Sequence, residues 1–215
     1  MRWDSIGALG GAIFVVLVII SFVVGGEPPD VGDPVTEIVD FWADNETSIY
    51  IGNGIGVLAV LFFLIFANHL RRMFAAAGDA PLATLVLVGA AIMTVGFAVD
   101  GTISLALAEE AENLDPTSVQ TLQALWDNDW LPMAVGLAVF LISTGVSIIQ
   151  TGLLPKWLGW IALLLFVLSF TPAGFVAFLA GAVLIIVISV MLALRGDRAP
   201  AATTPPPAAP PPATG

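Results

Sequence analysis

Six long apolar stretches run through this chain and limit it to a membrane environment. They cover residues 6–24, 49–67, 82–108, 131–150, 157–171 and 175–194. A helix that crosses the hydrocarbon core of a bilayer needs roughly 20 apolar residues, within a range of about 17 to 25. Charged residues make up only 11% of the chain, whereas soluble domains carry about 25%. The sequence therefore predicts an all-α, polytopic membrane helix bundle with six transmembrane helices in one domain, residues 1–194.

The fifth stretch, residues 157–171, is short for a membrane span. Thr171, Pro172, Ala173 and Gly174 separate it from the sixth stretch. Proline and glycine together break a helix, which favours two separate spans. One long bent helix over residues 157–194 is the alternative.

The positive charges predict how the chain is oriented. Every lysine and arginine lies at the N-terminus, between the second and third stretches, between the fourth and fifth, or after the sixth: Arg2, Arg71, Arg72, Lys156, Arg195 and Arg198. With six spans, all of these positions are on one side, which the positive-inside rule identifies as the cytoplasm. We expect a multi-pass plasma-membrane protein with both termini in the cytoplasm. Its topology anchors are Arg71, Arg72, Lys156 and Arg195.

The two long connections on the other side, residues 25–48 and 109–130, contain no lysine or arginine and hold seven and six of the 17 acids. Each has an aspartate followed by proline, which is typical of a helix start. Apolar residues then recur at helical spacing. The connections therefore predict two short extracytoplasmic amphipathic helices. The order of one span, one surface helix and a second span thus occurs twice along the chain. The predicted caps are Asp33 and Asp115, and the apolar stripes are Val35, Ile38, Val39 and Trp42, then Val119, Leu122, Leu125 and Trp126.

Asp100 is the one ionisable residue well inside a predicted span. A carboxyl group in the bilayer is costly, so it usually faces a partner or a water-filled cavity. Asn53 has a similar predicted depth, so the two side chains could hydrogen-bond across helices. One interpretation is an outward-facing polar pocket, with Tyr50 and Thr102 near its rim. The other is a purely structural interhelical hydrogen bond.

The acidic ends of the two connections are candidate calcium ligands, because Ca²⁺ prefers carboxylate and amide oxygens. The residues concerned are Asp44, Glu46, Asp127 and Asp129. They lack the spacing and the glycine of an EF-hand loop, and clustered surface acids are usually just solvated.

The chain has no cysteine and one histidine, so we expect no cofactor held by thiolates or histidines. It has no P-loop, nucleophile-elbow, zinc-protease or dinucleotide motif, so we expect no enzyme. It has no basic patch for nucleic acid. Residues 195–215 are rich in alanine and proline and predict a disordered cytoplasmic tail. A ligand for a proline-reading domain is the alternative for this tail.

Several segments resemble a broad group of bacterial multi-pass membrane proteins of unknown function, common in high-GC genomes. The likeness covers most of residues 6–194 and is carried by the segments 25–30 (Gly-Gly-Glu-Pro-Pro-Asp), 38–45, 66–71 (Phe-Ala-Asn-His-Leu-Arg) and 154–160 (Leu-Pro-Lys-Trp-Leu-Gly-Trp). These motifs concern topology, so the resemblance implies a membrane fold and assigns no functional residue.

Three functions remain open from the sequence. The first is a non-enzymatic accessory, sensory or envelope-associated subunit that contacts the lipid bilayer and either a membrane-protein partner or a second copy of itself. The second is a small transporter or channel that uses the pocket around Asn53 and Asp100. The third, an intramembrane enzyme acting on lipid, lacks an evident pair of base and nucleophile.

Overall fold

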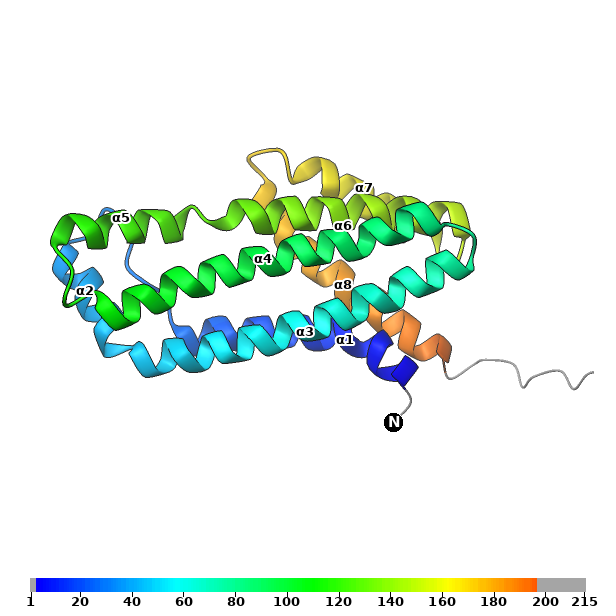
Figure 1. The fold of residues 1–215 in the computed structure, drawn as a ribbon. Coiled ribbons are helices and arrows are strands. Elements are labelled where there is room, and N and C mark those ends of the chain that lie inside the picture. The colour runs from blue at the N-terminus through cyan, green and yellow to red at the C-terminus, as the bar shows by residue number, and fades with distance from the viewer. Residues whose placement is uncertain (1–2, 197–215) are drawn as a thin grey trace, which may run out of the picture.

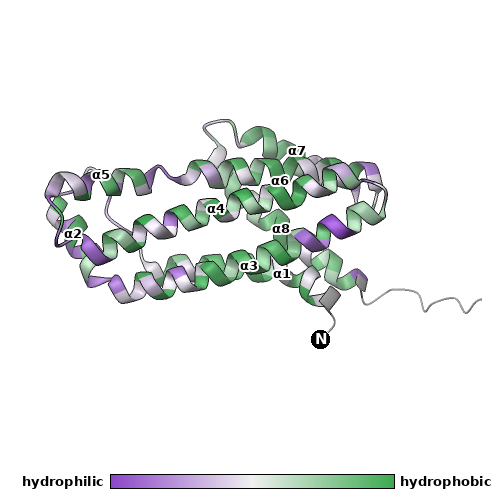
Figure 2. Ribbon diagram, in the orientation of Figure 1, coloured by the Kyte–Doolittle hydropathy of each residue, from purple (hydrophilic) through white to green (hydrophobic). Residues whose placement is uncertain are grey.

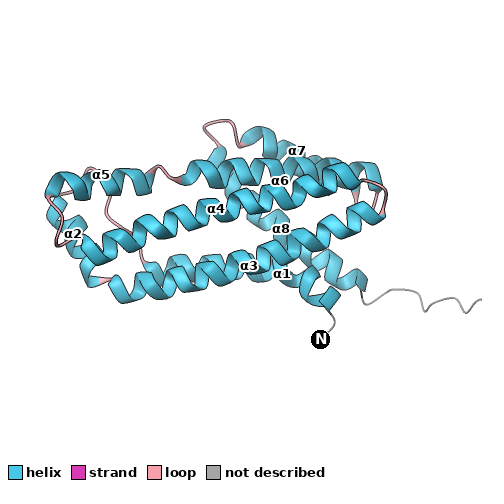
Figure 3. Cartoon of the chain, viewed as in Figure 1, coloured by secondary structure: helices cyan, strands magenta, loops and turns pink. Residues whose placement is uncertain are grey.

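The structure is a computed structural model that describes residues 3–196, and within these residues all regular structure is helical (Figure 3). The predicted all-α fold is therefore confirmed, while residues 197–215 of the predicted tail lie outside the described residues. The helices are α1 (Trp3–Gly25), α2 (Val35–Asp44), α3 (Glu46–Ala76), α4 (Ala80–Glu110), α5 (Pro116–Asp127), α6 (Trp130–Thr151), α7 (Lys156–Leu168) and α8 (Gly174–Gly196).

Five segments are long and apolar enough to cross a membrane: α1, α3, α4, α8 and the segment 116–151, which contains α6. Helix α7 has 13 residues, about 20 Å at 1.5 Å per residue, and is shorter than the roughly 30 Å hydrocarbon core. Its following turn nevertheless lies beside the start of α6, because Phe170 and Leu131 line one shared groove. A six-span count stays a prediction.

Helices α7 and α8 are separate and run in opposite directions (Figure 1). Helix α7 ends at Leu168, and Pro172 lies in the turn before α8. The alternative of one long bent helix over residues 157–194 is therefore wrong. The reason is the one expected from proline, which cannot continue the hydrogen bonding of a helix.

The two ends of the bundle differ in charge. Helix α1 begins and α8 ends at the same end, where the α3–α4 and α6–α7 connections also lie, while α2 and α5 lie at the opposite end (Figure 1). All four predicted anchors, Arg71, Arg72, Lys156 and Arg195, belong to the first end. Arg195 also donates a hydrogen bond to the carbonyl of Leu153. The end that carries α2 and α5 holds the acidic connections.

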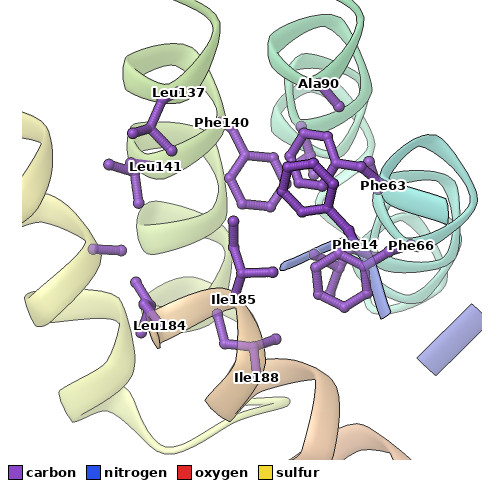
Figure 4. Packing of buried hydrophobic residues seen from close by; sticks show 14 of the residues in the cluster. Phe14, Phe63, Phe66, Ala90, Leu137, Phe140, Leu141, Leu184, Ile185 and Ile188 are labelled. Atoms are coloured by element: carbon purple, nitrogen blue, oxygen red, sulfur yellow. The ribbon is translucent and has the colours of Figure 1, made fainter. Parts of the chain in front are cut away.

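Close contacts between helices produce an aromatic layer in the middle of the bundle (Figure 4). The rings of Phe14 and Phe63 stack with centroids 4.5 Å apart, and Phe63 lies 5.1 Å from Phe140. Helices α4 and α6 approach closely, because a methyl group on Gly136 would lie 2.3 Å from the backbone nitrogen of Met93. The bundle interior around this layer is mainly apolar, and it also contains the buried hydroxyl groups of Ser143, Thr144, Ser147 and Ser189.

Hydrophobic residues predominate along the helices of the bundle (Figure 2), and many of them lie on its outer surface. Val57, Val95, Leu164 and Val183 are each more than half exposed. Soluble proteins rarely expose such large continuous apolar surface. The bundle therefore has apolar residues both in its core and on its outer surface. This distribution is expected of a helix bundle that faces lipid.

Helices α2 and α5 pack together over the outer ends of α3 and α4, and we call this unit the cap. Its apolar core is separate from that of the bundle and consists of Ile38, Trp42, Ile49, Ile103, Leu107, Ala108, Ala111 and Val119. The amphipathic helices predicted from the sequence are present, and the stripe of α2 faces inward. In α5 the prediction for Leu125 is wrong, because that side chain is 53% exposed and Gln123 is buried in the cap.

The two predicted helix caps behave differently. Asp115 accepts hydrogen bonds from the backbone N–H groups of Thr117 and Ser118 at 3.0 and 3.2 Å, as an N-cap residue does. Asp33 does not cap α2, because its carboxylate accepts a hydrogen bond from the N–H of Asp30 at 2.9 Å. Pro34 occupies the N-cap position instead, with no side-chain cap.

Candidate functional site

A polar layer separates the cap core from the bundle core. Along α3, Ile49 belongs to the cap core and Ala59 to the bundle core, and Asn53 lies between them. Along α4, Met93 and Ile103 bracket Asp100 in the same way. Both polar residues singled out in the sequence therefore lie at one level, where the two apolar clusters meet.

A small pocket occupies this level. Its volume is about 70 Å³, several times the roughly 10–15 Å³ that one water requires. The lining comes from α1, α2, α3, α4 and α5 and from the chain after α1. It comprises Ser21, Phe22, Gly25, Gly26, Pro28, Trp42, Ile49, Gly52, Asn53, Asp100, Ser104 and Trp126.

The amide of Asn53 joins α3 to α4. Its Nδ2 donates hydrogen bonds to the Ile49 carbonyl at 3.0 Å and to the Ser104 hydroxyl at 3.1 Å. The Ser104 hydroxyl in turn donates to the carbonyl of Gly101 at 3.1 Å. The cross-helix partner of Asn53 is therefore Ser104, and the hydrogen bond between Asn53 and Asp100 considered from the sequence is not formed. Asn53 thus has a structural bond in the pocket wall.

The α1 side of the pocket depends on another serine. Ser21 donates a hydrogen bond from its hydroxyl to the carbonyl of Gly52 at 2.8 Å. Gly52 allows this approach, because a methyl group there would lie 3.1 Å from the Ser21 carbonyl oxygen. Small residues commonly permit such close helix contacts in membranes. The four-residue spacing of Gly52 and Gly56 is a sequence signal for close helix contacts of this kind, whereas nothing in the apolar run of α1 indicates Ser21.

Two tryptophans and a glutamine form the roof of the pocket. The indole N–H of Trp42 donates to Oε1 of Gln123 at 2.7 Å, and Nε2 of Gln123 donates to the carbonyl of Pro29 at 2.9 Å. Trp42 and Trp126 meet edge to face, with ring centroids 5.7 Å apart. These contacts join α2, α5 and the connection after α1 into one rigid roof.

Asp100 is the one ionisable residue in the pocket lining. It is partly exposed, and its neighbours are the indole of Trp126 and the carboxyl of Asp129. The Trp126 N–H is buried without a partner in hydrogen-bond geometry, and so is one carboxyl oxygen of Asp129, a residue that is 8% exposed. The pocket therefore has one carboxyl group and one indole N–H without a partner in its lining, and the carboxyl of Asp129 lies nearby.

Tyr50 and Thr102 lie outside the pocket. Tyr50 is 44% exposed, and its hydroxyl hydrogen-bonds to Glu109 on the surface of α3 and α4. Thr102 is exposed and donates to the carbonyl of Ala98 at 2.7 Å within its own helix. Their sequence positions matched the pocket in depth, but their helix faces point elsewhere. The pocket residues that sequence reasoning missed are Ser21, Ser104, Trp42 and Trp126.

The candidate calcium ligands do not form one site. Asp44, Glu46 and Asp127 are exposed, whereas Asp129 is buried beside Asp100. Within the described part of the chain, no group of three or more His, Cys, Asp or Glu side chains is arranged to hold a metal ion. A hard divalent cation takes six or more oxygen ligands, which these positions do not assemble.

Comparison of the chain with protein-family models, with curated proteins and with solved structures found no match.

Proposed function

We propose that this chain is a non-enzymatic accessory or sensory subunit of a bacterial plasma membrane, and that it binds a small polar ligand in the pocket beneath its cap. In this proposal the cap lies outside the cell and both termini lie in the cytoplasm. The positive-inside rule supports this orientation, because the lysine and arginine residues of the described chain lie at the end opposite the cap.

The observation that carries the proposal is the position of the pocket between two filled apolar cores. A polar space of this kind is costly to keep between hydrophobic clusters unless water or a ligand satisfies it. Binding sites commonly combine apolar and aromatic walls with a few placed polar groups. The pocket fits that description, with two indole walls, Asp100 and Ser104. A ligand held there contacts the cap and the bundle together, so its binding would stabilise the contact between them.

A ligand screen with a blocked pocket tests this proposal. Gly25 lines the pocket, and a methyl group added to it meets no atom within 4 Å, so Gly25→Leu adds a bulky side chain at the pocket wall without a clash at its first carbon. Gly54→Leu is the matched control, since Gly54 has the same freedom and does not line the pocket. The protein in detergent is screened by thermal unfolding against small polar compounds of both charges and of none.

A ligand at about 100 times its dissociation constant stabilises the bound state by about 2.7 kcal/mol. A stabilising compound is therefore expected to raise the Tm of the wild type and of Gly54→Leu, and to leave Gly25→Leu unchanged. A screen in which no compound distinguishes the two leucine variants would contradict the proposed binding function.

The subunit role has its own test. A photo-crosslinking amino acid in place of an exposed cap residue such as Asp40 is expected to capture one reproducible membrane-protein partner, or a second copy of the chain, from intact cells. The same probe at Val95, on the lipid-facing surface of α4, is the control. Purified protein that always runs alone and gives no crosslinked band at the cap would argue against this role.

Transport is a second candidate function, because the pocket contains an acid between the cap and the bundle. The aromatic layer weighs against it in this conformation. Phe14 precedes Ser21 by seven residues, about 10 Å along α1, and the space below the pocket is filled by the rings around Phe63. A transporter would have to move these rings apart. Substrate flux into liposomes that disappears in Asp100→Asn would favour transport over binding alone.

A further inference from the structure

The pocket has acidic and aromatic walls and no positive group of its own. Asp100 lies on the wall formed by α4, and Trp42 and Trp126 supply two indole rings. The chain has no lysine or arginine between residues 3 and 70 or between residues 73 and 155. These intervals include every residue of the pocket lining. Among the described residues, the lysine and arginines belong to the end of the bundle opposite the cap, so none of them balances Asp100.

A second carboxyl makes this imbalance larger. Asp129 does not line the pocket, but it is 8% exposed and repels the charge of Asp100 when both groups are ionised. One of its oxygens is buried and has no hydrogen-bond partner among the described residues. A buried acid without a hydrogen bond or a counter-ion is costly, and native proteins rarely keep one without a reason. A positive ligand beside Asp100 would relieve the repulsion.

The aromatic walls select among cations. A cation over the face of an indole is attracted by the ring quadrupole, and aromatic cages recognise organic ammonium ions in this way. A metal ion fits less well, because it needs several oxygen ligands. The Ser21 and Ser104 hydroxyls of the lining each donate to a backbone carbonyl, and Oδ1 of Asn53 faces Gly101. The pocket therefore offers one carboxyl and two indole rings, with fewer free oxygen ligands than a hard divalent cation takes.

The surface around the pocket favours the arrival of a cation. The connections 25–48 and 109–130, which build the cap, carry 13 of the 17 acids and no lysine or arginine. A surface of one sign raises the local concentration of the opposite ion and speeds its association. The volume of about 70 Å³ limits the ligand to a few non-hydrogen atoms.

We propose that the pocket beneath the cap binds a small organic ammonium ion, with Asp100 as its counter-ion and Trp42 and Trp126 as its aromatic walls. This inference rests on the proposed binding function and names the ligand class for the same pocket. Methylammonium represents the class, and tetramethylammonium approaches the largest member that the space admits.

The test is a titration of the full chain in lipid nanodiscs, followed by tryptophan fluorescence, because two tryptophans line the pocket. The probes are methylammonium, tetramethylammonium and tetrabutylammonium chlorides, with sodium chloride at equal ionic strength as the reference. The variants are Asp100→Asn and Asp40→Asn, which remove the same charge from the pocket and from the exposed face of α2.

We expect a saturable change with methylammonium and tetramethylammonium in the wild type and in Asp40→Asn, and none with tetrabutylammonium. In Asp100→Asn the concentration for half-saturation should rise about tenfold or more, because a charged partner is lost. A change that sodium chloride reproduces, or one that is equal in Asp100→Asn and the wild type, would overturn the inference.

Gly25→Leu keeps the test decisive if Asp100→Asn fails to fold, because it retains the carboxyl and adds a bulky side chain at the pocket wall. Ammonium binding that persists unchanged in Gly25→Leu would place the site elsewhere and overturn the inference. The two proposals fail differently. If the screen finds an uncharged or anionic compound that Gly25→Leu blocks while the ammonium ions have no effect, the ammonium inference is wrong and the binding function stands. If no compound of any charge is blocked, both are wrong.

Discussion

Replacing Gln123 with alanine is expected to loosen the cap. The Gln123 side chain is fully buried, and its amide bonds to the Trp42 indole at 2.7 Å and to the Pro29 carbonyl at 2.9 Å. Truncation leaves the buried Trp42 N–H and the partly buried Pro29 carbonyl unpaired, and a fully buried group of this kind costs about 1–3 kcal/mol. Water that enters the space recovers part of this loss, so we expect the free energy of cap opening to fall by about 2–4 kcal/mol.

Hydrogen exchange measured on peptides from α2 and α5 reports this quantity locally. Since 1.4 kcal/mol corresponds to a factor of ten, the slowest amides of the cap should exchange about 30 to 700 times faster in Gln123→Ala. Peptides from the aromatic layer around Phe63 should keep their wild-type rates. Gln120→Ala is the control, because Gln120 lies on the same helix and is exposed. Equal exchange in the two variants would refute the role given to Gln123.

Three further perturbations follow from single contacts. In Gly101→Ala the new methyl group would lie 2.4 Å from Oδ1 of Asn53, so the Asn53 amide must move. The free energy of unfolding in detergent should therefore fall by about 1–3 kcal/mol. In the control Gly54→Ala the methyl group meets no atom within 4 Å, and the stability should change little. Ser189→Ala removes a hydroxyl that donates to the Ala8 carbonyl of α1 at 2.5 Å and accepts from the Ala12 N–H at 3.0 Å. Unfolding by SDS titration should show a loss of stability of about 0.5–2 kcal/mol. An unchanged stability would count against this contact. Hydrogen bonds from the side chain and the backbone N–H of Ser118 lower the pKa of Asp115 below its ordinary value of 3.8. The stabilisation of α5 by the Asp115 carboxylate is therefore complete above pH 3.8 and is lost as the pH falls through the lowered pKa. Hydrogen exchange of the first turn of α5 between pH 5 and pH 2 checks this, and a pH response that persists in Asp115→Asn would contradict it.

The apolar runs predicted the bundle because each helix in a membrane must be apolar over its own length. They also placed the ends of α3 and α4 that lie past the pocket to within three residues, at 49 and 108 against Glu46 and Glu110. They could not predict that these ends form a separate core, to which α4 contributes Leu107. That core depends on α2 and α5 folding together, and such a contact between two connections is not encoded in local hydropathy. Asp100 is consequently at the junction of cap and bundle, where it neighbours Asp129.

The site was predicted only in part for a similar reason. Sequence position gave Asn53 and Asp100 the same depth, but not the direction of each side chain, so the Ser104 partner was missed. In α5 the helical spacing admits a stripe through either Leu125 or Gln123. Gln123 is the buried one because its amide can satisfy the indole of Trp42 in the roof. Hydropathy alone cannot indicate that a polar side chain is buried, because its burial depends on the hydrogen-bond partner that it meets in the fold.

The most direct test of the capped pocket is thiol labelling from one side of the membrane. The chain has no cysteine, so each introduced thiol reports without background. A small, positively charged methanethiosulfonate reagent is added to intact cells that express Asp100→Cys or, as the lipid-facing control on the same helix, Val95→Cys. If the pocket opens toward the outer face beneath the cap, Asp100→Cys will be labelled and Val95→Cys will not. Labelling of Asp100→Cys only after the cytoplasmic side is exposed, or no labelling from either side, would contradict an outward-facing polar pocket.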